Sequence, residues 1–150
     1  MPVDPTETPR RRPASPYKLD DQVGFILRQA AQRHTTIFAA IMVEELTPTQ
    51  FAAIAKLAEV GPCSQNKLGR LTAMDGATIK GVIDRLTKRG MTETSPDPDD
   101  GRLLMVTLTG AGRAVAEQAL PAGQRITEET LAPLNPDEQA LLLRLLAKLR

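Results

Sequence analysis

The sequence predicts a mainly α-helical fold that carries one small β-hairpin. Apolar residues recur at helical spacing through most of residues 19–150. Two of these segments open with a capping residue followed directly by proline, which marks the first turn of a helix. Residues 91–108 depart from this pattern, because two short extended runs flank a cluster of turn residues there. With 150 residues, the chain fits one domain, or a domain with an attached dimerisation element.

Composition narrows the functional classes. Aromatic residues make up only 3% of the chain, so the core must be aliphatic, and the single cysteine, Cys63, excludes an intramolecular disulfide. One histidine, His34, is too few for a Cys/His metal site. The sequence has no glycine-rich phosphate loop and no paired carboxylates on one face. We therefore expect a protein that is not an enzyme and binds no cofactor. No run approaches the ~20 apolar residues of a membrane span, and we expect a cytoplasmic chain without membrane contact.

Residues 1–18 form a proline-rich segment that includes the arginine run from Arg10 to Arg12. Prolines at this density oppose both helix and strand, which predicts a disordered arm. Two interpretations of the arm stand side by side. It is either a solvated tail or a basic extension that contacts a phosphate backbone or a minor groove.

Residues 19–46 are expected to form one long helix, from Asp20 to Glu45. One face of this helix is made by residues at three- and four-residue steps: Val23, Leu27, Ala30, His34, Ile37 and Ile41. A helix this long usually packs against more than its own short chain. The segment is therefore a candidate for contact with a partner.

The segment from residue 47 onward begins with a strong signal for a new helix. Thr47 and Gln50 form a capping box around Pro48, and Gly61 with the following proline ends the helix. Ser64 can then cap a second, short helix.

A third helix is expected after a break at residues 72–74, from Asp75 to its end at Arg89 and Gly90. Its apolar stripe comprises Ile79, Val82, Ile83 and Leu86. Residues 91–95 and 103–108 then read as the two strands of a hairpin, joined by a proline-, aspartate- and glycine-rich turn.

The last region, residues 109–150, predicts two more helices. Thr109 caps the first, which runs to about residue 130 with an expected kink at Pro121, and Asn135 caps the second. Leucines cover too much of this last helix for a single apolar face. Such a surface indicates a partner, which is a second copy, the long first helix, or both.

Helix, short helix, turn, helix and hairpin is the plan of a winged helix-turn-helix lobe, here residues 47–108. Residues 64–90 hold six cations against two acids, although the whole chain has a formal net charge of only +1. This local concentration of positive charge predicts contact with double-stranded DNA. Gly81 lies inside the third helix, where glycine costs about 1 kcal/mol relative to alanine. Either DNA or another helix approaches closely at that turn.

Three stretches resemble the MarR (multiple antibiotic resistance regulator) family of transcription factors. They are LTPTQ at 46–50, TIKGVIDRLTKRG at 78–90 and DGRLLMVTLTGAG at 100–112. The resemblance implies a homodimer in which the helices of 19–46 and 109–150 form the dimerisation region and the winged lobes bind DNA. It also implies repression through a pseudo-palindromic operator, with release by a small-molecule effector. An activator is the alternative.

Outward positions and the resemblance together give the candidate DNA-contacting residues. They are Lys67, Asp75, Ala77, Thr78, Lys80, Gly81, Arg85, Lys88 and, on the hairpin or wing, Arg102. Thr78 and Lys80 are expected in the groove, and Lys67, Arg85 and Lys88 at phosphates. The resemblance assigns Asp100 to bracing the wing through Arg102. The resemblance also places Arg102 in the minor groove. Gly101 stands where a second arginine is common in the family, so the groove contact and the bracing of the wing both fall on Arg102, which cannot do both fully.

The resemblance implies an effector that is an aromatic carboxylate or an acyl-CoA thioester, bound between the dimerisation helices and the winged lobe. Candidate ligand-binding residues are Arg28, Arg33, His34, Phe38, Phe51 and Tyr17. His34 can instead be a hydrogen-bonded core residue, and the arginines can pair with acids on neighbouring helices. Two further alternatives are a thiol switch at Cys63 and a winged-helix module that binds protein.

Overall fold

The computed structural model describes residues 15–150. The arginine run of the predicted arm therefore lies outside the described residues, and residues 15–18 have no regular secondary structure. The chain divides into two compact units, residues 1–32 and residues 33–150, which are described separately. Helix α1 (Val23–Ile41) begins in the first unit and ends in the second.

The first unit contains a 3-10 turn, η1 (Leu19–Asp21), and the first turns of α1. Its surface carries several exposed apolar side chains, namely Tyr17, Leu19, Val23, Ile26 and Leu27. The long helix was predicted to reach Glu45, and this is wrong because α1 ends at Ile41. Glu44 and Glu45 adopt left-handed backbone conformations, with φ of 56° and 51°, which an α-helix cannot include.

The helices of the winged lobe begin where the capping residues predict. Helix α2 (Pro48–Val60) starts with the complete capping box of Thr47 and Gln50. Helix α3 (Gln65–Leu71) is capped by Ser64, and α4 (Gly76–Lys88) by Asp75. Gly61 and Gly90 follow α2 and α4 with φ of 77° and 75°, a conformation that favours glycine.

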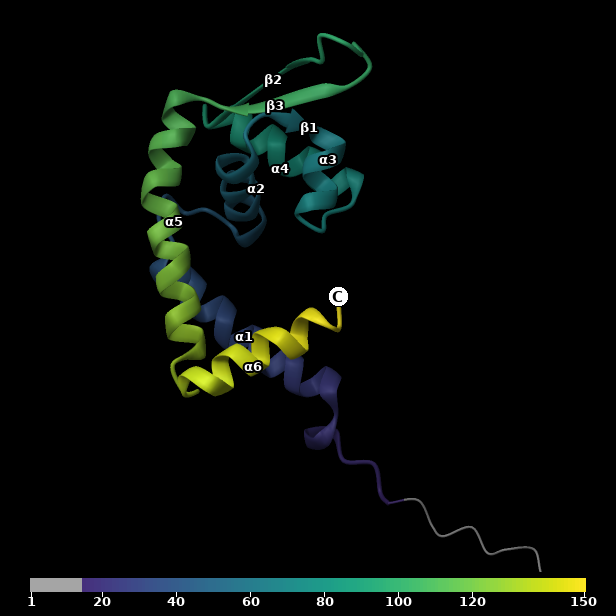
Figure 1. The fold of residues 1–150 in the computed structure, drawn as a ribbon, viewed down its shortest axis with the longest axis vertical. Helices are drawn as coiled ribbons and strands as arrows, with labels where there is room; N and C mark the ends of the chain where they lie inside the picture. Colours follow the sequence, from purple (N-terminus) through teal and green to yellow (C-terminus); the bar gives the residue numbers. More distant parts are fainter. Residues whose placement is uncertain (1–14) are drawn as a thin grey trace, which may run out of the picture. The chain divides into compact units, whose positions relative to one another are not determined.

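A small antiparallel sheet completes the lobe (Figure 1). The predicted hairpin is present as β2 (Thr92–Pro96) and β3 (Leu104–Leu108). A third strand, β1 (Cys63–Ser64), was not predicted and pairs with the other edge of β3, so the strand order is β1-β3-β2. Val106 lies at the centre, opposite Cys63 on one side and Thr94 on the other.

Two further helices follow the sheet. Helix α5 (Gly110–Leu131) is capped by Thr109 and continues as one element through Pro121, while α6 (Pro136–Ala147) starts with a capping box. The sheet lies at one end of α5, and α6 lies at the other (Figure 1). Within residues 15–150, no helix is both long and apolar enough to cross a membrane.

The core is aliphatic, as the composition predicts. Six large side chains are fully buried in the winged lobe: Ile54, Leu68, Ile79, Ile83, Leu86 and Val106. The apolar stripe predicted for the third helix is thus confirmed. Core burial fixes α4 against the lobe, so its opposite face is presented outward.

One junction joins the wing to α5. The Thr109 amide donates to the Met91 carbonyl at 3.1 Å, and the Thr109 hydroxyl donates to the Gly90 carbonyl. A Cβ atom added at Gly112 would lie 1.9 Å from the Met91 carbonyl oxygen. Glycine is therefore required where the first turn of α5 crosses the start of β2.

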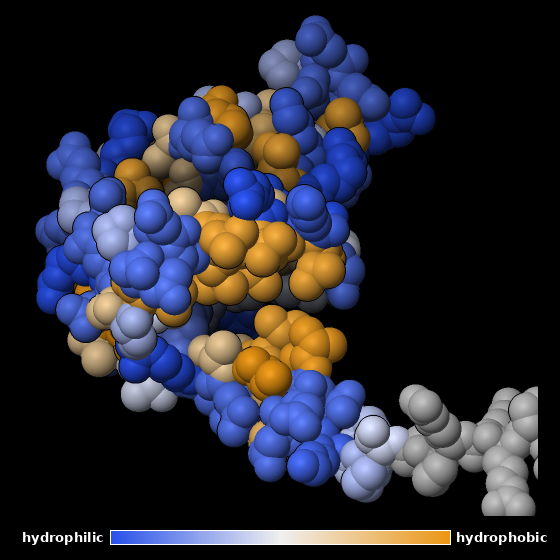
Figure 2. Space-filling view, turned by 60° about the horizontal axis from the view of Figure 1, so that its bottom comes forward, coloured by the Kyte–Doolittle hydropathy of each residue, from blue (hydrophilic) through white to orange (hydrophobic). Residues whose placement is uncertain are grey.

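The leucine-rich helix α6 has no buried residue among its twelve. Leu141, Leu143, Leu145 and Leu146 are exposed by 39–54%. In Figure 2, hydrophobic surface (orange) is exposed on the side of the molecule that faces the reader. Within residues 15–150, these four leucines are therefore not covered by other elements.

Candidate nucleic-acid interface

The outward face of α4 begins with a cap. Asp75 Oδ1 accepts a hydrogen bond from the Thr78 backbone amide at 2.7 Å. This bond, with a further contribution from the Thr78 side chain, lowers the pKa of the Asp75 carboxyl. Asp75 is thus engaged in capping, while Ala77 and Thr78 are exposed in the first turn beside it.

Lys80 is not a free cation. Its Nζ atom lies 2.9 Å from Asp84 Oδ2, one helical turn later, and the two side chains are 66% and 61% exposed. The spacing of four residues places both groups on the same outward side of α4. Lys80, which was predicted to reach the groove, is therefore paired with the Asp84 carboxylate.

Gly81 makes room for Arg85. A Cβ atom at Gly81 would lie 3.3 Å from Arg85 Nη1, and within 4 Å it would meet atoms of Arg85 alone. Packing of Gly81 against another helix of this chain is therefore the wrong explanation for the glycine. The Arg85 guanidinium folds back over the bare turn of α4.

A hollow of about 530 Å³ separates α4 from the wing. It is lined by Gly81, Asp84, Arg85, Thr87, Lys88 and Thr94. Thr94 belongs to β2 and was not among the predicted residues, because its position beside α4 depends on the register of the hairpin. The hollow brings two cations of the helix and a hydroxyl of the wing to one place.

The cations of residues 64–90 differ in availability. Within residues 15–150, Lys67, Arg70, Arg85 and Lys88 take part in none of the ion pairs. Arg89 instead donates to the Glu44 carbonyl at 2.6 Å and ties the end of α4 to the linker before α2. Arg89 keeps its charge in this bond, so only Lys80 among these cations is paired with an acid in the described residues.

The wing tip is organised by two aspartates. Asp97 Oδ1 accepts hydrogen bonds from the backbone amides of Asp99 and Asp100, which closes the turn. Asp100 then pairs with Arg102 through two side-chain contacts, Nε to Oδ1 at 3.0 Å and Nη2 to Oδ2 at 3.2 Å. These bonds lower the pKa of the Asp100 carboxyl. Asp97 was missed, although an aspartate before turn residues is a known signal.

The predicted ligand-binding residues fall into both units. Arg28 and Tyr17 are exposed in the first unit. In the second unit, Arg33 donates to the Glu129 carbonyl and His34 Nδ1 lies 2.8 Å from Thr130 Oγ1, both on α5. His34 is hydrogen-bonded, as the alternative interpretation expects, but it is exposed and so is not a core residue. The partner of Arg33 is a backbone carbonyl instead of an acid.

Phe38 and Phe51 pack edge to face, with ring centroids 6.0 Å apart. Gly123 of α5 lies against the Phe51 ring, because a Cβ atom there would be 2.5 Å from it. Three of the six predicted residues therefore lie against α5: Arg33 at Glu129, His34 at Thr130 and Phe51 at Gly123. Phe38 joins them through its contact with Phe51.

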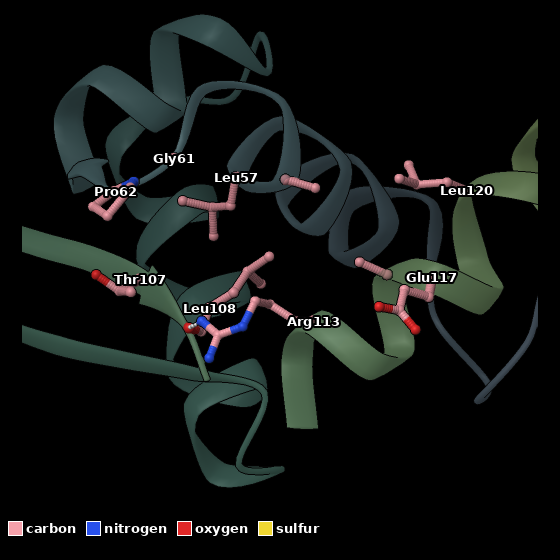
Figure 3. Close-up of a pocket in the computed structure, with 10 residues that line it drawn as sticks. Leu57, Gly61, Pro62, Thr107, Leu108, Arg113, Glu117 and Leu120 are labelled. Carbon is pink, nitrogen blue, oxygen red and sulfur yellow. Dashed lines mark hydrogen bonds between the residues drawn. The ribbon is translucent and has the colours of Figure 1, made fainter. Parts of the chain in front are cut away.

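A separate cavity of about 420 Å³ lies between α2, β3 and α5 (Figure 3). Its wall is mainly apolar and includes Leu57, Pro62, Leu108 and Leu120, with Arg113 and Glu117 contributed by α5. The Arg113 guanidinium donates to the Leu108 carbonyl at 3.0 Å. None of the predicted ligand-binding residues lines this cavity.

Cys63 is buried in β1, with 4% exposure. Burial raises the pKa of its thiol, and the nearby charge of Lys67 opposes this with a smaller effect. A thiol with a raised pKa is a poor nucleophile at neutral pH, which argues against the redox alternative.

Comparison with known proteins agrees with this geometry. Residues 46–104 match the model of the MarR family. The transcriptional repressor NicR of Pseudomonas putida is 40% identical over 136 residues, which are 90% of this chain and 86% of NicR.

Solved structures extend the similarity to most of the chain. A probable transcriptional regulator from Pseudomonas aeruginosa is 58% identical with a TM-score of 0.87, covering 89% of this chain and 100% of that one. BpsR of Bordetella bronchiseptica, whose DNA binding is regulated by 6-hydroxynicotinic acid, is 41% identical with a TM-score of 0.86, covering 90% and 97%. The winged helix-turn-helix fold is thereby confirmed, and the chain belongs to the MarR family of transcriptional regulators.

Proposed function

We propose that the chain is a homodimeric repressor that binds a pseudo-palindromic operator and is released by a small anionic aromatic compound. The observation that carries the DNA-binding part is the outward face of α4. Arg85 and Lys88 are exposed there without ion-pair partners among the described residues, and they face the wing across the hollow. A phosphate backbone supplies the negative charge that this surface lacks.

Two lobes are needed for a pseudo-palindrome. In a dimer, the two copies of α4 read half-sites separated by about one helical turn, roughly 34–36 Å. The exposed leucines of α6 supply an apolar surface for such a dimer. A MarR variant from Escherichia coli, 26% identical with a TM-score of 0.78, has been solved with operator DNA, which supports this mode of binding.

The effector part is supported by the BpsR comparison and by the residues beside α5. An aromatic acid needs a cation for its carboxylate and an apolar wall for its ring. Arg33 and the pair Phe38 and Phe51 offer these groups in the second unit. The BpsR comparison supports an aromatic acid and gives no support to a CoA thioester, so the proposal is restricted to aromatic acids.

DNA binding is tested by fluorescence anisotropy with a duplex from the region upstream of the gene, against an unrelated duplex of equal length. We expect preferential binding to the upstream duplex, and affinity that falls steeply between 50 and 200 mM salt, on the order of 10³-fold or more for six phosphate contacts. Arg85→Ala should weaken binding to both duplexes and reduce the salt slope by about one. Unchanged affinity of this variant at every salt concentration would contradict the docking of α4.

Release is tested by adding 6-hydroxynicotinic acid, salicylate or benzoate to the preformed complex. We expect one acid to lower DNA affinity while its neutral amide does not. Arg28→Ala and Arg33→Ala separate the two candidate cations, since the variant that loses the response without losing DNA binding identifies the carboxylate partner. If no aromatic acid changes the affinity, the effector part of the proposal is wrong and the DNA-binding part stands.

A further inference from the structure

We propose that Asp84 is a specificity residue, which keeps the Lys80 ammonium away from DNA phosphates and leaves it available to a guanine edge. The inference rests on the proposed DNA binding and adds a role that the charge count of α4 conceals. Asp84 acts here as a positioning residue, because its effect on DNA passes through Lys80.

The contrast between Lys80 and its neighbours motivates the proposal. Lys80 Nζ lies 2.9 Å from Asp84 Oδ2. Arg85, which follows Asp84 in the sequence, has no ion-pair partner among the described residues. Gly81 leaves space for the Arg85 guanidinium on the adjoining turn. One surface therefore presents a free cation and a cation that carries its own counter-charge.

The two cations respond differently to a phosphate. Arg85 gains an opposite charge wherever a phosphate lies, so it contributes equally to all sequences. A phosphate that approaches Lys80 also approaches the Asp84 carboxylate, and the two negative charges repel. Lys80 must then leave Asp84 unpaired or share itself between two anions, which lowers the gain from non-specific contact.

A guanine edge avoids this conflict. Its O6 and N7 atoms are uncharged acceptors in the major groove, and lysine is a common partner for both. The ammonium has three donors, so it can keep one on Asp84 and offer two to the base. Asp84 thus penalises the wrong partner more than the right one, which is a general route to specificity.

The ion pair is weak enough to be adjustable. Both side chains are more than half exposed, and exposed pairs contribute little to folding stability. Asp84→Asn is therefore expected to fold like the wild type, with an unchanged thermal melting curve. Its effect should appear in DNA binding instead.

The experiment compares the full chain and Asp84→Asn on the upstream duplex and on an unrelated duplex of equal length. We expect roughly threefold to fivefold tighter binding to the unrelated duplex, a smaller gain on the upstream duplex, and a fall in the ratio of the two affinities. The salt slope on the unrelated duplex should rise by about 0.9, the value for one additional phosphate contact. Glu59→Gln is the matched control, because Glu59 forms an exposed ion pair with Lys56 on α2, at 3.0 Å.

A second pair of variants decides whether Asp84 acts through Lys80. In the Lys80→Ala background, Asp84→Asn should leave the affinity ratio unchanged. The inference is overturned if Asp84→Asn raises the affinity for the unrelated duplex equally in the wild-type and Lys80→Ala backgrounds. It is also overturned if Glu59→Gln raises that affinity equally, or if Asp84→Asn leaves the affinity ratio unchanged. If the inference fails but the wild type binds the upstream duplex, the proposed function still stands. If the wild type binds neither duplex, the inference and the proposed function are both wrong.

Discussion

Arg102 and Asp100 form a bidentate ion pair at the tip of the wing, although the Arg102 side chain is 91% exposed. Arg102 also donates its backbone amide to Asp100 Oδ1 at 3.1 Å. The carboxylate therefore shapes the turn and orients the guanidinium at the same time. The pair is the bracing contact that the family resemblance assigns to Asp100 and Arg102.

Replacing Arg102 tests the wing as a DNA contact. Arg102→Ala should weaken binding to every duplex by roughly tenfold and lower the salt slope, because an arginine in a minor groove interacts with the strong negative potential there. Fluorescence anisotropy across a salt series measures both quantities. Arg125→Ala on α5 provides the control of equal charge change, and an equal loss in that variant would show a general charge effect.

The Asp75 cap predicts a defined pH dependence. Hydrogen bonding lowers the pKa of this carboxyl in the folded state, so its contribution to stability is present above the unfolded pKa of about 3.9. That contribution is lost as the pH falls through the lower, folded pKa. Urea titrations of wild type and Asp75→Ala should therefore differ at pH 7 and converge at strongly acidic pH. Asp75→Asn retains a capping oxygen and should lie between them at pH 7; a constant difference at all pH values would contradict the carboxylate cap.

Gly112 is expected to be intolerant of a side chain. The added methyl of Gly112→Ala would collide with the Met91 backbone, and overpacking of this kind costs about 1–3 kcal/mol in free energy of unfolding. Thermal or urea denaturation followed by circular dichroism measures the loss. Gly24→Ala in α1 is the control, since a Cβ atom there meets no heavy atom within 4 Å. Equal stability of the two variants would show that the backbone relaxes at no cost.

Cys63 should be inert towards mild oxidants. Because burial raises its thiol pKa, little thiolate is present at pH 7. We expect peroxide to leave the DNA affinity unchanged, and iodoacetamide to label the native protein slowly and the urea-unfolded protein rapidly, as measured by intact mass. Peroxide-dependent release that disappears in Cys63→Ala would instead restore the thiol-switch alternative.

The α6 leucines give a test of assembly. Leu145→Asp places a charge on a surface that the proposed dimer buries. We therefore expect the wild type to sediment as a dimer at micromolar concentration and this variant to sediment as a monomer. Val60→Asp at the end of α2 has a comparable exposure, 44% against 46% for Leu145, and should remain dimeric. If both variants sediment as the wild type does, α6 is not the dimer surface.

Local signals in the sequence account for most of the fold. The caps at Thr47, Ser64, Asp75, Thr109 and Asn135 were all predictable, since each side chain bonds an amide within its own first turn. Periodicity identified the buried stripe of α4 in the same way. Such features depend only on residues three or four positions apart.

The missed features depend on long-range contacts. Strand β1 has two residues, too few for any pattern, and exists only because β3 lies beside it. Left-handed Glu44 and Glu45 keep the helix from reaching its predicted end, and Arg89 of α4 bonds the Glu44 carbonyl there from 45 residues away. Thr94 joins the hollow through the hairpin register. The pairing of Lys80 with Asp84, by contrast, was readable from its four-residue spacing.

The junction at Met91 has a mechanical consequence. Its carbonyl is bonded by Thr109 and covered by Gly112, so the first turn of α5 cannot tilt without carrying the base of β2 with it. A compound that tilts the first turn of α5 would therefore be expected to move the base of the wing with it. Such a compound would need no contact with bases or phosphates, because this backbone contact joins α5 to the wing.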